Sequence, residues 1–264
     1  MKKVFSFVAV SLALVLSASF ISCKAPSGSS GGGGQNPPAV QIGTKAPSEA
    51  KAVGDIVFND GSVTPYTAEL TLTDEQKSKA IAIIYKVDGS RAYGVGLVHI
   101  GGIVWCISSA NGYHKFFTEI ICTPTGSADE TTFTGDTNGS DNFTKIKEAL
   151  GTDDDTGTPG NYPAFDFVNN YKNQTNSHVI GTVYENGWYL PSIAELFDIW
   201  KVRAAVNAAS ALCGGSQFVS GYYWSSSQYE GNYTYIYDAK FDSSFDYTGY
   251  NASNTDFVCC IHVF

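Results

Sequence analysis

Basic residues are scarce in this sequence of 264 residues. Lys and Arg number 16 against 25 Asp and Glu, which gives a formal net charge of −9. After Arg203 the only basic residue is Lys240. Nucleic acids and anionic lipid head groups favour clusters of Lys and Arg. We therefore expect neither of them to be a partner of the folded part of the chain.

The sequence also lacks the spacings that metal centres and catalytic nucleophiles need. No Cys-x-x-Cys pair is present, so a zinc site made of cysteines is not expected. The four histidines share no spacing with one another, and no nucleophile–base motif accompanies them. We expect no cofactor and no catalytic residue.

One acidic loop is a candidate cation site. Asp136, Asn138 and Asp141 bring oxygen ligands close together, which suits calcium. No bidentate glutamate follows at the expected distance, and Asn-Gly-Ser is common turn chemistry. Calcium and a simple turn therefore both stay open for this loop.

The first 22 residues predict a signal peptide. Lys2 and Lys3 are followed by residues 4–21, which are apolar apart from four serines and too short for a spanning helix. Phe20-Ile21-Ser22-Cys23 resembles a lipobox in the relaxed form of spirochaete lipoproteins, which implies cleavage before Cys23 and acylation of its sulfur and new amino group. Two or three acyl chains anchor a protein stably. An ordinary signal peptide with an incidental cysteine is the alternative.

Residues 23–52 predict the lipidated cysteine and a flexible tether. Residues 27–34 are all Ser or Gly, and Asn36-Pro37-Pro38 follows, a composition that cannot bury enough apolar surface to fold. About 29 residues of this kind have a root-mean-square span of about 30 Å. The remaining residues, 53–264, are numerous enough for one domain with a full core.

Hydrophobic periodicity in residues 53–264 predicts an α+β domain with two main helices packed on antiparallel sheets. One helix is expected to begin at Pro163, and the other to begin at Ser192 and run to about Ala209, with Ser192 and Glu195 forming a capping box. Strands are expected at 53–58, 80–87, 92–100 and 103–108 and from 218 onward, short helices after Thr73 and at 143–150, and loops over the rest of 123–161 and over 242–251.

Five cysteines remain beside Cys23. They are Cys106, Cys122, Cys213, Cys259 and Cys260. An odd number leaves at least one thiol unpaired in an exported protein. Because Cys259 and Cys260 are adjacent in an expected strand, their side chains should leave opposite faces. We expect one to face the core and the other to be exposed.

The last part of the chain is rich in tyrosine. Residues 222–250 hold eight of the 16 tyrosines, separated by Ser, Asn, Asp and Gly. This composition is typical of antibody binding surfaces, because Tyr gives rigid contact area at low entropy cost while Ser, Asn and Gly adapt their hydrogen bonds. A tyrosine-rich strand surface packed against its own loops is the alternative. Trp188, Leu190 and Trp224 are expected in the core beneath one contiguous exposed patch. The predicted ligand-binding residues are Tyr229, Asn232, Tyr233, Tyr235, Tyr237, Asp242, Ser244, Phe245, Asp246, Tyr247, Tyr250 and Asn251.

Three stretches together carry a family resemblance. They are residues 187–196 (GWYLPSIAEL), residues 223–227 (YWSSS) and the closing residues 257–264 (FVCCIHVF). In this order they resemble the C-terminal domain family of the Legionella collagen-like adhesin, which looks like a branch of the formylglycine-generating-enzyme type of C-type lectin fold. That family closes with two arginines where this chain has Cys259 and His262, so no role of the arginines carries over. With its leader, the chain looks most like the treponemal variable lipoproteins, whose C-terminal segment is diversified by a retroelement.

The resemblance implies a monomeric outer-membrane lipoprotein, displayed at the cell surface, that binds a protein or glycan ligand and is not an enzyme. The residue types in 242–251 are those that such diversification produces. Enzymes of the formylglycine-generating lineage use a cysteine pair several residues apart, and the closing stretch holds no such pair. Two alternatives stay open, a degenerate or metal-dependent enzyme of that lineage and a structural envelope lipoprotein without a dedicated ligand.

Overall fold

The computed structural model describes residues 41–126 and 130–264. The expected signal peptide, Cys23 and most of the expected tether lie outside these residues. Residues 41–52, which we assigned to the tether, pack on the domain. Gly43 N donates to Ser62 Oγ at 2.7 Å, and Lys45 forms a β-bridge with Val63. The folded part of the chain therefore begins before the predicted boundary at residue 53.

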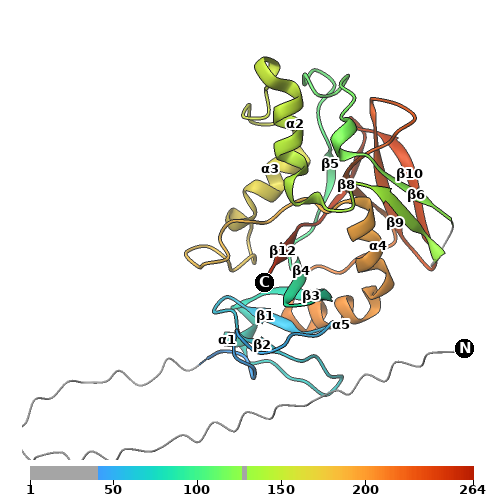
Figure 1. Ribbon diagram of the computed structural model, residues 1–264. Coiled ribbons are helices and arrows are strands. Elements are labelled where there is room, and N and C mark those ends of the chain that lie inside the picture. The colour runs from blue at the N-terminus through green and yellow to red at the C-terminus, as the bar shows by residue number, and fades with distance from the viewer. Residues whose placement is uncertain (1–40, 127–129) are drawn as a thin grey trace, which may run out of the picture. The chain divides into compact units, whose positions relative to one another are not determined.

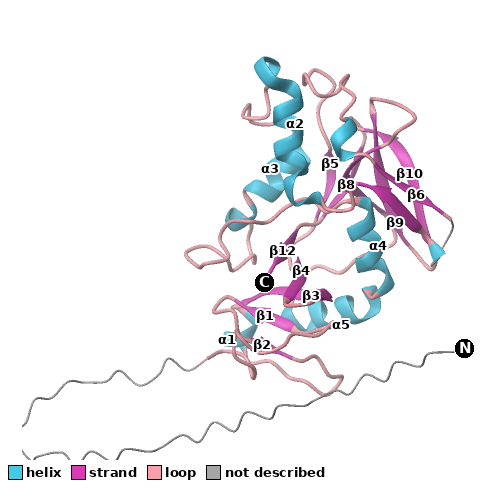
Figure 2. Cartoon of the chain, in the orientation of Figure 1, coloured by secondary structure: helices cyan, strands magenta, loops and turns pink. Residues whose placement is uncertain are grey.

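Strands and helices are interspersed along the described chain, which confirms the predicted α+β class (Figure 2). The strands are β1 (Ile56–Phe58), β2 (Val63–Thr64), β3 (Ala80–Asp88), β4 (Arg91–Gly96), β5 (Ile100–Val104), β6 (Cys122–Thr125), β7 (Thr132–Gly135), β8 (Tyr222–Gln228), β9 (Tyr235–Phe241), β10 (Phe245–Asn251), β11 (Thr255–Val258) and β12 (Ile261–Val263). The α-helices are α1 (Asp74–Lys77), α2 (Asn142–Leu150), α3 (Pro163–Asn169), α4 (Ile193–Lys201) and α5 (Arg203–Cys213). Short 3₁₀ turns occur at Thr118–Ile120, Gly139–Asp141, Gly151–Asp153 and Tyr171–Asn173.

The first sheet joins the two ends of the domain. Its strand order is β12-β4-β3-β1-β2, so the C-terminal strand pairs with β4 in the first half of the chain (Figure 1). The predicted hairpin is confirmed as β3 and β4, and Gly89 in its turn has a φ of 59°, a conformation that favours glycine. Residues 80–85 are all buried, as expected of the central strand of a sheet covered on both faces.

The second sheet is mixed, with the order β10-β9-β8-β11-β5. Strand β11 runs parallel to β8 and antiparallel to β5. The prediction of a loop over 242–251 is wrong for most of this stretch, because all seven residues of β10 pair with β9. The expected loops of 123–161 likewise include a hairpin, β6–β7. The strand that we expected at 103–108 lies earlier in the chain, where β5 spans Ile100–Val104.

The helices begin where the sequence indicated. Thr73 and Ser192 each close a capping box, and Pro163 stands in the first turn of α3. The long helix expected to about Ala209 is instead two helices, because Val202 has non-helical φ and ψ of −113° and 11°. At this break the Arg203 guanidinium donates to the Trp200 carbonyl at 2.8 Å. Within the described residues, no helix has the length and apolar character needed to cross a bilayer.

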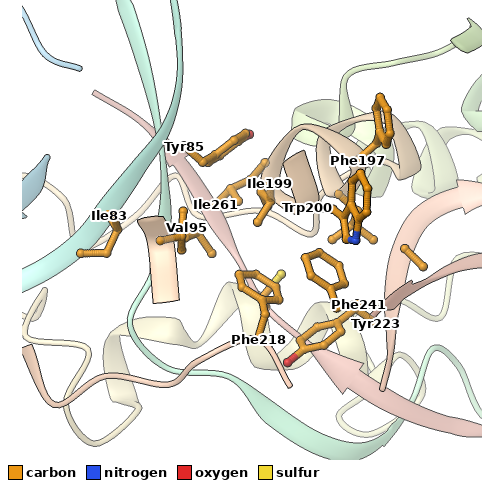
Figure 3. Packing of buried hydrophobic residues seen from close by; sticks show 14 of the residues in the cluster. Ile83, Tyr85, Val95, Phe197, Ile199, Trp200, Phe218, Tyr223, Phe241 and Ile261 are labelled. Atoms are coloured by element: carbon orange, nitrogen blue, oxygen red, sulfur yellow. The ribbon is translucent and has the colours of Figure 1, made fainter. Parts of the chain in front are cut away.

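The core consists of two clusters of buried side chains. Figure 3 shows part of the first, in which the Phe218 and Phe241 rings stack 4.3 Å apart. Trp188, Leu190 and Trp224 lie in the second, as predicted. The five cysteines of the described chain are free thiols and all are buried.

Cys259 and Cys260 are divided between the two clusters. Cys259 packs in the first and Cys260 in the second, so their side chains do leave opposite faces. The expectation that one is exposed is wrong, because both are fully buried. The two residues lie in the short connection between β11 and β12, where the chain passes between the clusters.

Candidate functional site

The tyrosine-rich segment forms strands β8, β9 and β10 and their connections. Strand pairing places Tyr247 opposite Ala239 and Tyr250 opposite Ile236. Because side chains alternate along a strand, odd-numbered and even-numbered residues of β9 and β10 lie on opposite faces of the sheet. The single contiguous patch that we expected is therefore divided between two faces.

One face carries a cluster of four tyrosines, which we call the tyrosine cluster: Tyr229, Tyr235, Tyr237 and Tyr247. The Tyr229 ring lies 6.3 Å from that of Tyr235 and 5.2 Å from that of Tyr237, and the Tyr237 ring lies 6.2 Å from that of Tyr247. Gly249 leaves room for this packing, since a Cβ there would lie 2.6 Å from Tyr229 Cγ. Tyr229, Tyr235 and Tyr247 are half-buried.

Neighbouring elements fix the tyrosine cluster in place. Phe245, on the same face of the sheet, packs on Phe197 of α4 with ring centroids 4.9 Å apart. The Tyr237 hydroxyl donates to Glu230 at 2.7 Å, and burial together with this bond raises the pKa of Tyr237. The Tyr247 hydroxyl donates to the Gly126 carbonyl at 3.0 Å. Tyr247 is thus held by a hydrogen bond and by ring contacts, and all three half-buried rings keep part of their surface open.

The structure separates the twelve predicted ligand-binding residues by exposure. Two of them, Tyr237 and Phe245, are buried, and their assignment to an exposed surface is wrong because they face α4 and the first core cluster. The exposed residues are Tyr233, Asp242, Ser244, Asp246 and Tyr250, and the half-buried ones are Tyr229, Asn232, Tyr235, Tyr247 and Asn251. Ten of the twelve therefore keep some contact with solvent, on different sides of the sheet.

The opposite face of the second sheet carries a pair of carboxyl groups. Asp238 of β9 and Asp256 of β11 lie on either side of β8 with their carboxyl groups close enough to affect each other's pKa, and Thr248 N donates to Asp238 at 3.2 Å. Burial raises the pKa of Asp238 to about 8, with the charge of Asp256 adding to the effect, and burial raises the pKa of Asp256 to about 6. The pair therefore holds a proton near neutral pH. Exposed Tyr250 lies on this face, with its ring 6.0 Å from that of Trp224.

A third group of aromatic and polar side chains lies at the end of the sheet. The exposed Tyr233 ring is 6.0 Å from the His114 ring, and the Tyr113 hydroxyl donates to Asn251 at 3.0 Å. Sequence reasoning missed Tyr113, His114 and the Asp238–Asp256 pair. The aromatic Tyr113-His114 doublet in a polar loop was a visible signal. The Asp238–Asp256 pair had no such signal in the sequence, because it depends on the pairing of β11 with β8.

The calcium candidate loop is organised around a lysine. Lys145 Nζ lies 2.7 Å from an Asp136 carboxylate oxygen and 2.9 Å from one of Asp141. The Asn138 side chain accepts from Ser140 N, as in an ordinary turn. Since an ammonium group already neutralises both carboxylates, these residues do not fit a calcium site. The described residues contain no group of three or more His, Cys, Asp or Glu side chains arranged to hold a metal ion.

The cysteines lack the character of nucleophiles. Burial raises the pKa values of Cys106, Cys122 and Cys213 to about 12, and it also raises those of Cys259 and Cys260. The thiolate is the reactive form, and it is suppressed at neutral pH in such surroundings.

Comparison with solved structures gives a likeness of fold. No protein-family model and no curated protein matches the chain. A crystal structure of a fimbrial protein from Bacteroides ovatus superposes with a TM-score of 0.53 and 16% sequence identity, over 81% of this chain and 48% of that protein. The chain thus spans about half the length of that protein. At this level of identity the likeness shows a shared fold.

Proposed function

We propose that this chain is a surface-displayed binding protein that contacts a protein or glycan ligand through the tyrosine cluster. The observation that carries the proposal is the set of half-buried rings of Tyr229, Tyr235 and Tyr247. Tyr229 packs on Tyr235 and Tyr237, and Tyr247 packs on Tyr237 and Phe245. Rigid aromatic side chains lose little entropy on binding, and they dominate the energy of many interfaces.

The groups of the cluster are mostly neutral rings and hydroxyls. Glu230, which accepts from the Tyr237 hydroxyl, is a charged group beside them. Lys240, the one basic residue of the segment, lies on the opposite face and pairs with Asp242 at 3.4 Å. Tyrosine rings and hydroxyls suit the apolar faces and hydroxyl groups of sugars, and equally the centre of a protein interface.

A lipid anchor on Cys23 would hold the tyrosine cluster close to the membrane. We propose that Cys23 is lipidated and that the domain is an outer-membrane lipoprotein of C-type lectin-like fold. The fold that it shares with a protein described as fimbrial supports a place at the cell surface. Diversification of the segment by a retroelement belongs to the same proposal, with substitutions concentrated in residues 229–251.

The enzyme alternative finds less support. The cysteines that the formylglycine-generating lineage would use are absent at the required spacing, and Cys259 and Cys260 are fully buried with raised pKa values. We therefore propose that the chain binds and does not catalyse. A purely structural envelope protein would have no reason to keep three large rings partly open to solvent.

The test compares two double variants on opposite faces of the same sheet. Tyr235→Ala with Tyr247→Ala removes two rings of the tyrosine cluster, whereas Tyr222→Ala with Tyr250→Ala removes two rings of the opposite face. Glycan and extracellular-protein arrays identify a ligand of the wild type, and its affinity is then measured for each variant.

We expect the cluster variant to lose tenfold or more in affinity and the opposite-face variant to bind as the wild type does. Such a loss corresponds to about 1.4 kcal/mol, modest for two interface aromatics. Circular dichroism at rising temperature checks that both variants stay folded. Loss of binding only in the opposite-face variant would overturn the assignment, and absence of any ligand on either array would favour the structural alternative.

A further inference from the structure

Two aliphatic side chains are unusually exposed on the surface of the described chain. Ile180 is 66% exposed and Val183 is 86% exposed, and no other large apolar side chain of the described residues exceeds the 52% of Tyr233. Both lie in the loop of residues 176–184 between α3 and α4, which Figure 1 shows as a gold segment at the left of the domain. Single exposed aliphatic residues are common, whereas apolar side chains that gather in one place mark interaction sites.

The backbone of this loop is fixed by hydrogen bonds within the loop and to its base. Thr182 N donates to the Val179 carbonyl at 3.1 Å, and Tyr184 N donates to the Thr182 hydroxyl at 3.1 Å. Gly181 N donates to the Glu185 carboxylate at 2.8 Å. Val179 is fully buried and packs in the second core cluster, so it ties the loop to the body of the domain. The two exposed aliphatic side chains therefore belong to an ordered turn.

The composition of the loop favours a lipid surface over a protein partner. Residues 176–184 contain no Asp, Glu, Lys or Arg. The next residue, Glu185, is paired with Lys172 at 2.6 Å. Protein interfaces are usually anchored by Tyr, Trp or Arg, and residues 180–183 (IGTV) include none of them. Aliphatic side chains without charged neighbours suit the boundary between the head groups and the acyl chains of a bilayer.

The loop lies at the end of the domain where the chain enters it. The Tyr184 hydroxyl lies directly against Gly61, in the turn between β1 and β2. The same turn holds the first described residues, because Ile42 N donates to the Asp60 carboxylate at 2.9 Å. The exposed loop and the start of the folded chain therefore flank one turn.

We propose that this loop inserts Ile180 and Val183 into the surface of a lipid bilayer with neutral or zwitterionic head groups. The inference rests on the lipidation of Cys23 proposed above. Residues 24–40 would give the tether a root-mean-square span of about 23 Å, which keeps the end of the domain that carries the loop close to the bilayer. Tethering raises the effective concentration of lipid at the loop, so two side chains hold a contact that would be too weak for an untethered protein. Anionic lipids are not favoured, because acidic residues outnumber basic ones in the chain and the loop has no Lys or Arg.

The test places an environment-sensitive fluorophore on the loop. Val183→Cys in a Cys23→Ala background gives one reactive surface thiol, because the other five cysteines are buried. A hexahistidine tag at the start of the tether binds this protein to phosphatidylcholine vesicles that contain a nickel-chelating lipid. A nitrobenzoxadiazole label should then emit at shorter wavelength, brighten at least twofold and be quenched by nitroxides on the acyl chains. The tag makes this result independent of lipidation in the cell, which detergent partitioning of the wild type tests separately.

Matched controls separate the effect of the loop from that of the label. The same label at Phe116→Cys, an exposed apolar position beside the end of β8, should keep the emission that it has in water. Ile180→Asp should remove most of the emission change at Val183→Cys, whereas Val219→Asp, at another exposed valine, should leave it intact. Because all these positions are exposed, the melting temperature should change little in each variant.

Three results on the vesicles would overturn the proposal. They are an unchanged emission of the label at Val183→Cys, an equal change at Phe116→Cys, and an emission change that Ile180→Asp does not reduce. Crosslinking of the loop to an envelope protein in cells, without an emission change on vesicles, would assign the loop to a protein interface and would equally overturn it.

Discussion

Replacement of Asp238 by Asn should abolish a dependence of stability on pH that the Asp238–Asp256 pair creates. Burial raises the pKa of Asp238 to about 8 and that of Asp256 to about 6, whereas an unfolded aspartate titrates near 3.9. Between these values the folded state keeps a proton that the unfolded state has lost. Stability from this source is therefore full below about pH 4 and declines as pH rises toward 8.

The size of this pH dependence is worked out for one proton that the folded state retains and the unfolded state loses. Each pH unit over which the folded state holds one extra proton lowers the free energy of unfolding by about 1.4 kcal/mol. Between pH 5 and pH 7 the proton that Asp238 retains should cost the wild type about 3 kcal/mol. In Asp238→Asn the amide is neutral throughout, accepts from Thr248 N and donates to Asp256, so most of this slope should vanish.

Urea unfolding at pH 5, 6, 7 and 8 measures the effect. Asp246→Asn, which neutralises an exposed carboxylate on the same face of β10, is the matched control and should keep the slope of the wild type. Parallel pH profiles for the wild type and Asp238→Asn would refute the reasoning, because they would mean that the pair ionises as freely in the folded state as in the unfolded one.

Two further predictions concern the core and the anchor. Trp224→Ala should lower the free energy of unfolding by about 3–5 kcal/mol, since the side chain is fully buried and its indole N–H donates to the Ile103 carbonyl at 2.8 Å. A loss below about 1 kcal/mol in urea unfolding would contradict this packing. Cys23→Ala should release the protein from the detergent phase to the aqueous phase in a partitioning experiment while the circular dichroism of the domain stays unchanged. A wild type that already partitions into the aqueous phase would argue against lipidation.

Local signals in the sequence were sufficient for the elements that depend on neighbours along the chain. The capping box of Ser192 and Glu195 places both partners within one turn of helix, so its three-residue spacing could be read directly. The β3–β4 hairpin likewise depends on the Asp88-Gly89 turn between two apolar runs. The break at Val202 could not be anticipated in this way, because residues 193–209 contain no Gly or Pro that would mark the end of a helix.

The candidate site depended on information that residue spacing does not carry. The tyrosines were the correct residue type for a rigid surface, yet their division between two faces required the register of β9 against β10. The Asp238–Asp256 pair required in addition the parallel pairing of β11 with β8, two strands that have β9 and β10 between them in the chain.

The alternation of side chains along β9 and β10 separates positions that build the domain from positions that are exposed. Tyr237 and Phe245 are buried against α4 and the first core cluster, so their size and shape are constrained by packing. Asp246 and Tyr250, on the opposite face of the sheet, are exposed, and most substitutions there change stability by roughly 0.5 kcal/mol or less. Tyr235 and Tyr247, which we propose meet the ligand, share the face of Tyr237 and Phe245 and are half-buried, so the proposed ligand surface is built directly on the packing that holds the sheet.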